Sequence, residues 1–384
     1  MLGCVKAAIA TSFLVALTSA LAPPHRRPVP VVIWHGLGDR YDAEGLLSLK
    51  RDLETRPGLE GVFVHLVQVG QDGAADQKAT FFGNAHAQID HVCQQLLALP
   101  EITDRTLNPS GKFDAIGFSQ GGQLLRGVVE RCGGERGLDV RNLITLGSQH
   151  LGISALPPCP PNSSPFSPCR LMHLSLVHSS IYSSYAQSNI VPAQYFRNYA
   201  SQAELDKYLT GPSFLRDINN ERPGDSQARA AVDASSNVPG STTSRGGSGS
   251  EPRNATYKEN FSRLNKLVLL RFSDDQTVVP PTSAHFTLPS SSSSSSSSSA
   301  PASYDPLPFV DLPLYVDDYI GLRALDERHA VVLGVCPGVH MEIRDECWDA
   351  VVAHLGDDRG GGGSARDANE RREPERPSRL VIQL

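Results

Sequence analysis

The chain has 384 residues, of which 20% are charged and 40% hydrophobic, and its formal net charge is −6. This composition is that of a globular protein long enough to bury one large core. No basic stripe stands out, so nucleic acid is not an expected partner.

The first 22 residues are typical of a secretory signal peptide. Lys6 supplies a positive charge, residues 7–17 are apolar, and Ala20-Leu21-Ala22 or Thr18-Ser19-Ala20 offers a cleavage site. The apolar run is shorter than the roughly 20 residues of a membrane span, which favours cleavage over an anchor. We therefore expect export, and no later segment is apolar enough to cross a bilayer.

Cysteines and sequons agree with export. Apart from Cys4, the chain has an even number of cysteines, which predicts disulfides without fixing their pairing: Cys93, Cys132, Cys159, Cys169, Cys336 and Cys347. Zinc is not expected because no CxxC pair is present, and we expect no other metal or cofactor. Sequons predict glycosylation at Asn162, Asn254 and Asn260.

Strands alternate with helices along the chain. Short apolar runs predict buried strands at residues 31–34, 62–69, 113–118, 143–146, 266–272 and 330–335. Helical periodicity appears at residues 85–99, 122–131 and 342–355. This alternation predicts an α/β fold with a mostly parallel sheet and helices on both faces.

Other segments interrupt this core, which we expect to span residues 23–356. Residues 151–263 are predicted to be an insertion that covers the top of the sheet, with a Pro-rich loop at 157–168 and helices around 180–209. Low-complexity composition predicts disorder at 223–252, in the polyserine run at 290–299 and in the tail at 357–384.

A G-x-S-x-G motif is the strongest sign of chemistry. Ser119 lies between Gly117 and Gly121, directly after an apolar strand and before a helix. This is the setting of a nucleophile elbow, a tight turn that tolerates only small residues beside the serine and exposes its hydroxyl at the carboxyl ends of the strands. The pattern predicts a serine hydrolase of the α/β-hydrolase fold.

A serine nucleophile needs a base and an orienting acid, which follow it in this fold in the order acid, then His. His340 follows the last predicted strand, whereas His329 precedes that strand and His285 lies near the polyserine run. Asp274 and Asp275 both follow the strand at 266–272, and their positions alone do not separate them.

The oxyanion hole requires backbone N–H donors. One is expected from Gln120, the residue after the nucleophile. The other is expected from the loop after the first strand, His35-Gly36-Leu37-Gly38, where we choose Leu37.

Several motifs in chain order resemble the lysosomal palmitoyl-protein thioesterase family. They are residues 32–39 (VIWHGLGD), 117–123 (GFSQGGQ), 147–152 (GSQHLG), 217–222 (DINNER) and 254–260 (NATYKEN). The resemblance implies removal of palmitate from S-acylated cysteines, with Ser119 as nucleophile and His340 as base. The family's Phe-x-x-Asp segment implies that the acid is Asp275, and the oxyanion donors carry over to Leu37 and Gln120.

The resemblance also implies an acyl groove lined by the insertion, with the candidates Ile181, Tyr185, Ile190, Val191 and Phe196. Ordinary helix packing is the alternative for each. The family's disulfides map onto Cys93–Cys132 and Cys159–Cys169, and elimination leaves Cys336–Cys347, which departs from the family pattern.

The resulting hypothesis is a palmitoyl-protein thioesterase of the lysosome, the vacuole or the extracellular space, with palmitoylated proteins and long-chain acyl thioesters as substrates. Its rivals are a secreted lipase or carboxylesterase acting on oxygen esters, and a non-catalytic lipid-binding protein on the same fold.

Overall fold

The computed structural model describes residues 27–177, 180–199, 201–223, 225, 252–289, 306–307, 309–356 and 380–381. The predicted signal peptide, the polyserine run and nearly all of the 223–252 insert and the tail lie outside these residues. No helix in the described part of the chain is long and apolar enough to cross a membrane.

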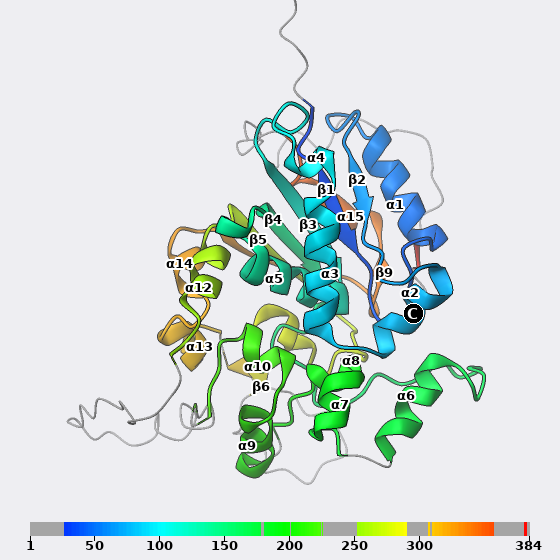
Figure 1. The fold of residues 1–384 in the computed structure, drawn as a ribbon, viewed down its shortest axis with the longest axis vertical. Coiled ribbons are helices and arrows are strands. Elements are labelled where there is room, and N and C mark those ends of the chain that lie inside the picture. The colour runs from blue at the N-terminus through cyan, green and yellow to red at the C-terminus, as the bar shows by residue number, and fades with distance from the viewer. Residues whose placement is uncertain are drawn as a thin grey trace, which may run out of the picture.

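A parallel sheet of six strands in the order β2-β1-β3-β4-β5-β8 forms the centre of the molecule (Figure 1). Its strands are β1 (Val31–Trp34), β2 (Val64–Leu66), β3 (Lys112–Phe118), β4 (Asp139–Leu146), β5 (Lys266–Phe272) and β8 (Val331–Cys336). Two short antiparallel pairs join β6 (Leu288–Pro289) to β7 (Pro306–Leu307) and β9 (Glu342–Ile343) to β10 (Leu380–Val381). All six predicted core strands are present, although β2 is shorter than the predicted 62–69.

Helices cover both faces of the sheet because the central strands are apolar on both sides. On one face, Val32 and Ala115 belong to the core shared with α3 (Ala85–Leu97), α5 (Gln120–Cys132) and α12 (Ala255–Ser262). On the other face, Ile33 and Ile116 belong to the core shared with α1 (Glu44–Thr55) and α15 (Asp345–Val352). The predicted α/β-hydrolase fold is confirmed.

The remaining helices are short. Four lie outside the predicted insertion: α2 (Gly73–Phe81), α4 (Pro100–Thr103), α13 (Pro313–Val316) and α14 (Leu322–Glu327). The described residues also form the 3₁₀ turns η1 (Gly134–Arg136), η3 (Pro281–His285) and η5 (Phe309–Asp311). Neither α1 nor α2 was predicted from the sequence, and the predicted helix at 342–355 begins only at Asp345, after β9.

Short helices between β4 and β5 gather below the sheet in Figure 1. They are α6 (Pro168–Val177), α7 (Ser184–Asn189), α8 (Val191–Gln194), α9 (Gln202–Thr210) and α10 (Phe214–Ile218). Leu205 and Tyr208 of α9 pack with Leu215 of α10 in a small core of their own. Within the predicted 151–263 insertion, α12 differs from these helices, since its Phe261 packs into the core on the sheet.

Candidate active site

Ser119 occupies the sharp bend between β3 and α5. Its backbone has φ +50° and ψ −120°, which is the strained conformation of a nucleophile elbow. A Cβ on Gly117 would lie 2.1 Å from Gly122 Cα, and one on Gly121 would lie 2.3 Å from the Trp34 carbonyl oxygen. Larger residues at either position would therefore push the strand and the helix apart.

Two later loops bring an imidazole and a carboxylate to this serine. His340 Nε2 lies 3.0 Å from Ser119 Oγ, and His340 Nδ1 lies 2.7 Å from Asp275 Oδ2. The side chains of His340 and Asp275 are 3% and 1% exposed, so water screens their interaction little. The three side chains thus form one hydrogen-bonded chain.

The structure separates the two aspartates that the sequence left open. Asp275 Oδ1 accepts hydrogen bonds from the backbone N–H groups of Thr277 (2.9 Å) and Val278 (3.0 Å), which orients Oδ2 toward the imidazole. Asp274 is exposed, and its carboxylate accepts a hydrogen bond from the Ser273 hydroxyl. Asp274 is therefore outside the hydrogen-bonded chain.

Other histidines lie elsewhere. His285 Nε2 is 2.9 Å from the Gly334 carbonyl, and His329 precedes β8 at the opposite end of that strand. His150 stacks on Phe286 with ring centroids 4.8 Å apart, and burial lowers its pKa well below the usual value. His150 is thus a neutral core residue.

The loop after β1 is held by α2, which sequence reasoning missed. The N–H of Gly38 donates to Thr80 Oγ1 at 2.9 Å, and Gln77 Nε2 donates to the Gly38 carbonyl at 2.6 Å. These two hydrogen bonds fix the backbone next to Leu37. The N–H of Leu37 itself donates to no group in the described part of the chain.

A buried hydrogen bond between a histidine and an aspartate supports the same loop. His35 Nε2 lies 2.8 Å from Asp76 Oδ2, and both side chains are almost fully buried. Burial alone would raise the pKa of Asp76, but the hydrogen bond and charge of His35, with backbone N–H groups of Gly70 and Val69, hold it below the usual value. An ionised Asp76 therefore anchors β1's loop to α2.

Gln120, the other expected oxyanion donor, is the first residue of α5, where backbone N–H groups lack helical partners. Its side chain is held by Tyr195, whose hydroxyl donates to Gln120 Oε1 at 3.0 Å. Tyr195 comes from the insertion, so the insertion contacts the elbow directly.

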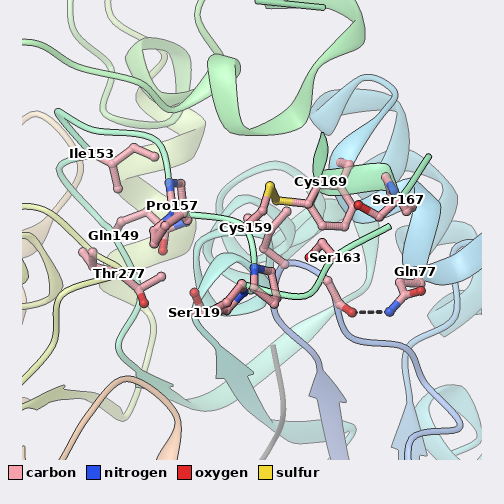
Figure 2. A pocket seen from close by; sticks show the side chains of 18 of the residues that line it. Gln77, Ser119, Gln149, Ile153, Pro157, Cys159, Ser163, Ser167, Cys169 and Thr277 are labelled. Carbon is pink, nitrogen blue, oxygen red and sulfur yellow. Dashed lines mark hydrogen bonds between the residues drawn. A yellow bond between two sulfur atoms is a disulfide. The ribbon is translucent and has the colours of Figure 1, made fainter. Parts of the chain in front are cut away.

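A cavity of about 350 Å³ opens beside Ser119 (Figure 2). This volume is in the range of small-molecule sites. Its walls come from the loop after β1, from α2, from the loops after β4 and β5, and from the Pro-rich part of the insertion. The lining residues are Leu37, Gly38, Gln77, Phe81, Ser119, Gln149, Ile153, Pro157–Pro161, Ser163, Ser167–Cys169, Tyr195, Thr277 and Val278.

None of the five predicted groove residues lines this cavity. Val191 is fully buried in one small core, and Ile190 is fully buried in another that includes Leu37 and Phe81 of the cavity wall. Phe196 and Ile181 pack against these two cores. Tyr185 is 57% exposed. The apolar wall of this cavity comes instead from Leu37, Phe81, Ile153, Val278 and the prolines before α6.

The structure contains the disulfides Cys93–Cys132, Cys159–Cys169 and Cys336–Cys347. Cys159–Cys169 forms part of the cavity wall (Figure 2). His173 lies near this pair, but sulfur atoms joined in a disulfide are not thiolate ligands for a metal. Cys336–Cys347 closes the loop that carries His340.

The three sequons differ in accessibility. Asn162 and Asn254 are exposed. Asn260 is only 5% exposed, and its Nδ2 donates to the Glu130 carbonyl at 2.9 Å. A glycan on Asn260 would replace one of the two hydrogens of this buried Nδ2, at the contact between α12 and α5.

Comparison with known proteins identifies the family. Residues 30–340 match the family model described as palmitoyl protein thioesterase. Palmitoyl-protein thioesterase 1 of Caenorhabditis elegans is 28% identical over 86% of this chain and 92% of its own. Palmitoyl-protein thioesterase 3 of Dictyostelium discoideum is 26% identical over 87% of this chain and 92% of its own.

Two further proteins are similar to this chain. A Drosophila melanogaster protein named as a homolog of a lysosomal thioesterase is 26% identical over 81% of this chain and 85% of its own. Among solved structures, Zea mays acyl-protein thioesterase 2 is 13% identical over 86% of this chain and 94% of its own. The TM-score of this match is 0.31, and no conclusion about the fold rests on it. The match over residues 30–340 establishes that the chain belongs to the palmitoyl protein thioesterase family.

Proposed function

We propose that this protein hydrolyses long-chain fatty acyl thioesters, and that it removes palmitate from S-acylated cysteines of proteins and peptides. The observation that carries the proposal is the hydrogen-bonded chain of Ser119, His340 and Asp275 beside a largely apolar cavity. The family membership supports the choice of a thioester.

The first half-reaction acylates the enzyme. His340 Nε2 takes the proton of Ser119 as Oγ attacks the thioester carbonyl carbon, and the N–H groups of Leu37 and Gln120 stabilise the oxyanion. The carbon–sulfur bond then breaks, and the cysteine sulfur leaves as a thiol with the proton that His340 took from Ser119, which returns the imidazole to its neutral form. Asp275 holds the imidazole in the tautomer that presents a free Nε2 to the serine.

The second half-reaction releases the acid. His340 takes a proton from a water molecule as the water oxygen attacks the acyl-serine carbonyl. The tetrahedral intermediate collapses, the proton returns to Ser119 Oγ, and the fatty acid leaves. The same donors stabilise both oxyanions, because both develop at the same carbonyl oxygen.

The test compares a palmitoyl-cysteine peptide with the matched palmitoyl-serine peptide, at acidic and at neutral pH. We expect a higher kcat/KM on the thioester, and a loss of kcat by a factor of about 10⁴ to 10⁶ in Ser119→Ala with folding unchanged. A Ser119→Ala protein that hydrolyses the thioester at the wild-type rate would disprove the assignment.

The rival functions give other outcomes. Preference for the palmitoyl-serine peptide would indicate a lipase or carboxylesterase. Absence of hydrolysis together with absence of labelling by a fluorophosphonate would indicate a lipid-binding protein without catalysis.

We also propose a place in the secretory pathway, in the lysosome or vacuole or outside the cell. The signal-like first 22 residues, the three disulfides and the exposed sequons support it. Localisation of the tagged protein with and without residues 1–22 tests it.

A further inference from the structure

Helix α6 is apolar on both faces, yet only one face is covered. Met172 and Cys169 point into a small core with Phe81 of α2 and Ile190. Leu171, Leu174 and Val177 lie on the opposite side, because they follow one another at helical spacing three residues apart. Apolar residues on both sides of a helix are normally buried, whereas the second side of α6 is exposed in the described structure.

The uncovered face is strongly exposed. Leu174 is 56% exposed and Val177 is 75% exposed, and Phe166, just before the helix, is 82% exposed. We call Phe166, Leu171, Leu174 and Val177 the α6 patch. Large apolar side chains that gather on one exposed helix are typical of a surface that binds another apolar surface.

The charge around the α6 patch narrows the choice of partner. The chain carries 41 Asp and Glu residues, but the stretch from Val140 to Ala203 has none. Of its arginines, Arg141 and Arg197 are buried in ion pairs, whereas Arg170 lies exposed on α6 beside the patch. Apolar residues with an exposed cation beside them, on a chain segment without acidic residues, complement a lipid surface that carries negative head groups.

The helix that carries the α6 patch begins at the cavity beside Ser119. Ser167, Pro168 and Cys169, at the start of α6, line that cavity. A protein-bound acyl chain is inserted in a bilayer before it is hydrolysed, so an entrance that touches the bilayer lets the chain move into the cavity with little exposure to water.

We propose that the α6 patch is a docking surface for an anionic lipid bilayer, from which the acyl chain passes into the cavity. Only the passage of the acyl chain into the cavity rests on the proposed thioesterase function. The docking itself does not depend on catalysis. A second copy of the chain and another protein are the alternative occupants.

The test is flotation of the full-length protein with vesicles of phosphatidylcholine and phosphatidylglycerol, in a ratio of about 7:3, and with vesicles of phosphatidylcholine alone. The protein is first treated with a glycosidase, because Asn162 lies in the chain segment that forms the cavity wall. We expect stronger binding to the anionic vesicles. The double variant Leu174→Glu/Val177→Glu should bind at least about tenfold more weakly, and Arg170→Gln about fivefold more weakly.

Val316→Glu is the matched control. Val316 is 51% exposed on α13, against 56% for Leu174, and α13 lies far from α6 in Figure 1. We expect Val316→Glu to bind vesicles like the wild type and Leu174→Glu to bind more weakly. Equal loss in both variants, or no binding of the wild type to anionic vesicles, would overturn the proposal.

Activity separates this inference from the proposed function. On a water-soluble short-chain thioester, Leu174→Glu/Val177→Glu should keep its kcat/KM within about twofold, whereas on a palmitoylated peptide in vesicles it should lose at least about tenfold. A wild type that floats but hydrolyses neither substrate contradicts the thioesterase and leaves the docking surface intact. Light scattering that shows a wild-type dimer, dissociated by the double variant, together with no flotation, would assign the patch to a second copy instead.

Discussion

Gly147 lies directly against the imidazole of His340. A Cβ on Gly147 would be 2.9 Å from His340 Cε1 and 3.1 Å from His340 Nδ1, and the Gly147 backbone has φ +60°. Gly147, the residue after β4, thus leaves room for the imidazole of His340, and any side chain at this position would displace that imidazole.

We predict that Gly147→Ala lowers kcat by about 10²-fold, because a shift of the imidazole by about 1 Å misplaces it relative to Ser119. KM should change less, since Gly147 does not line the cavity. Steady-state kinetics on a soluble thioester measure both. Gly137→Ala is a control with a similarly positive φ of +94° far from the site. An unchanged kcat in Gly147→Ala would show that the imidazole position is not critical.

The adjacent aspartates offer a matched pair of substitutions. Asp275→Asn should lower kcat by about 10⁴-fold, because an amide favours the wrong tautomer of His340. Asp274→Asn should leave kcat within about twofold, because the Asp274 carboxylate is exposed and accepts a hydrogen bond from the Ser273 hydroxyl rather than from His340. Kinetics of the two variants side by side decide the assignment, and the reverse order of effects would transfer the role of acid to Asp274.

The buried carboxyl group of Glu130 should make the free energy of unfolding depend on pH. It lies fully buried in α5 near Arg126, and burial raises the pKa of Glu130 to about 8 despite that arginine. A raised carboxyl pKa means that the folded state holds its proton more tightly than the unfolded state. The free energy of unfolding should therefore fall as the pH rises from about 4.5 to 8, by up to about 1.4 kcal/mol per pH unit.

Urea unfolding at several pH values measures this slope. Glu130→Gln should remove much of it, because the amide carries no proton to lose. A stability that rises between pH 5 and 8 in the wild type, with the same slope in Glu130→Gln, would contradict the prediction.

The sequons on α12 are expected to differ in modification. Mass spectrometry of the secreted protein should find a glycan at Asn254 and none at Asn260, because Asn260 Nδ2 is buried in its hydrogen bond to Glu130. Thr256→Ala should remove the Asn254 glycan with little effect on stability. Asn260→Asp should destabilise the fold by about 1–3 kcal/mol, since the Glu130 carbonyl loses its donor. A glycan on Asn260 of the folded protein would refute this reading.

Local sequence was sufficient to predict the sheet strands, the elbow and the position of His340. Apolar runs mark strands buried on both faces, and a serine between glycines at a strand end is readable without distant contacts. Residues 31–34 and 266–272 were placed with the bounds that the structure gives. Helices α1 and α2 were missed, and α2 has little amphipathic pattern because its polar residues Asp76 and Thr80 are buried to hold the loop after β1.

Only the tertiary structure decided which groups meet. Asp274 and Asp275 are neighbours in sequence, and the backbone N–H groups of Thr277 and Val278 select which carboxylate turns to His340. The residues of the cavity wall could not be predicted from the sequence either. Ile190 and Val191 are as apolar as the residues that line the cavity, and only tertiary packing determines which apolar side chains face it. Sequence patterns report burial along one element, whereas a site depends on how separate loops approach one another.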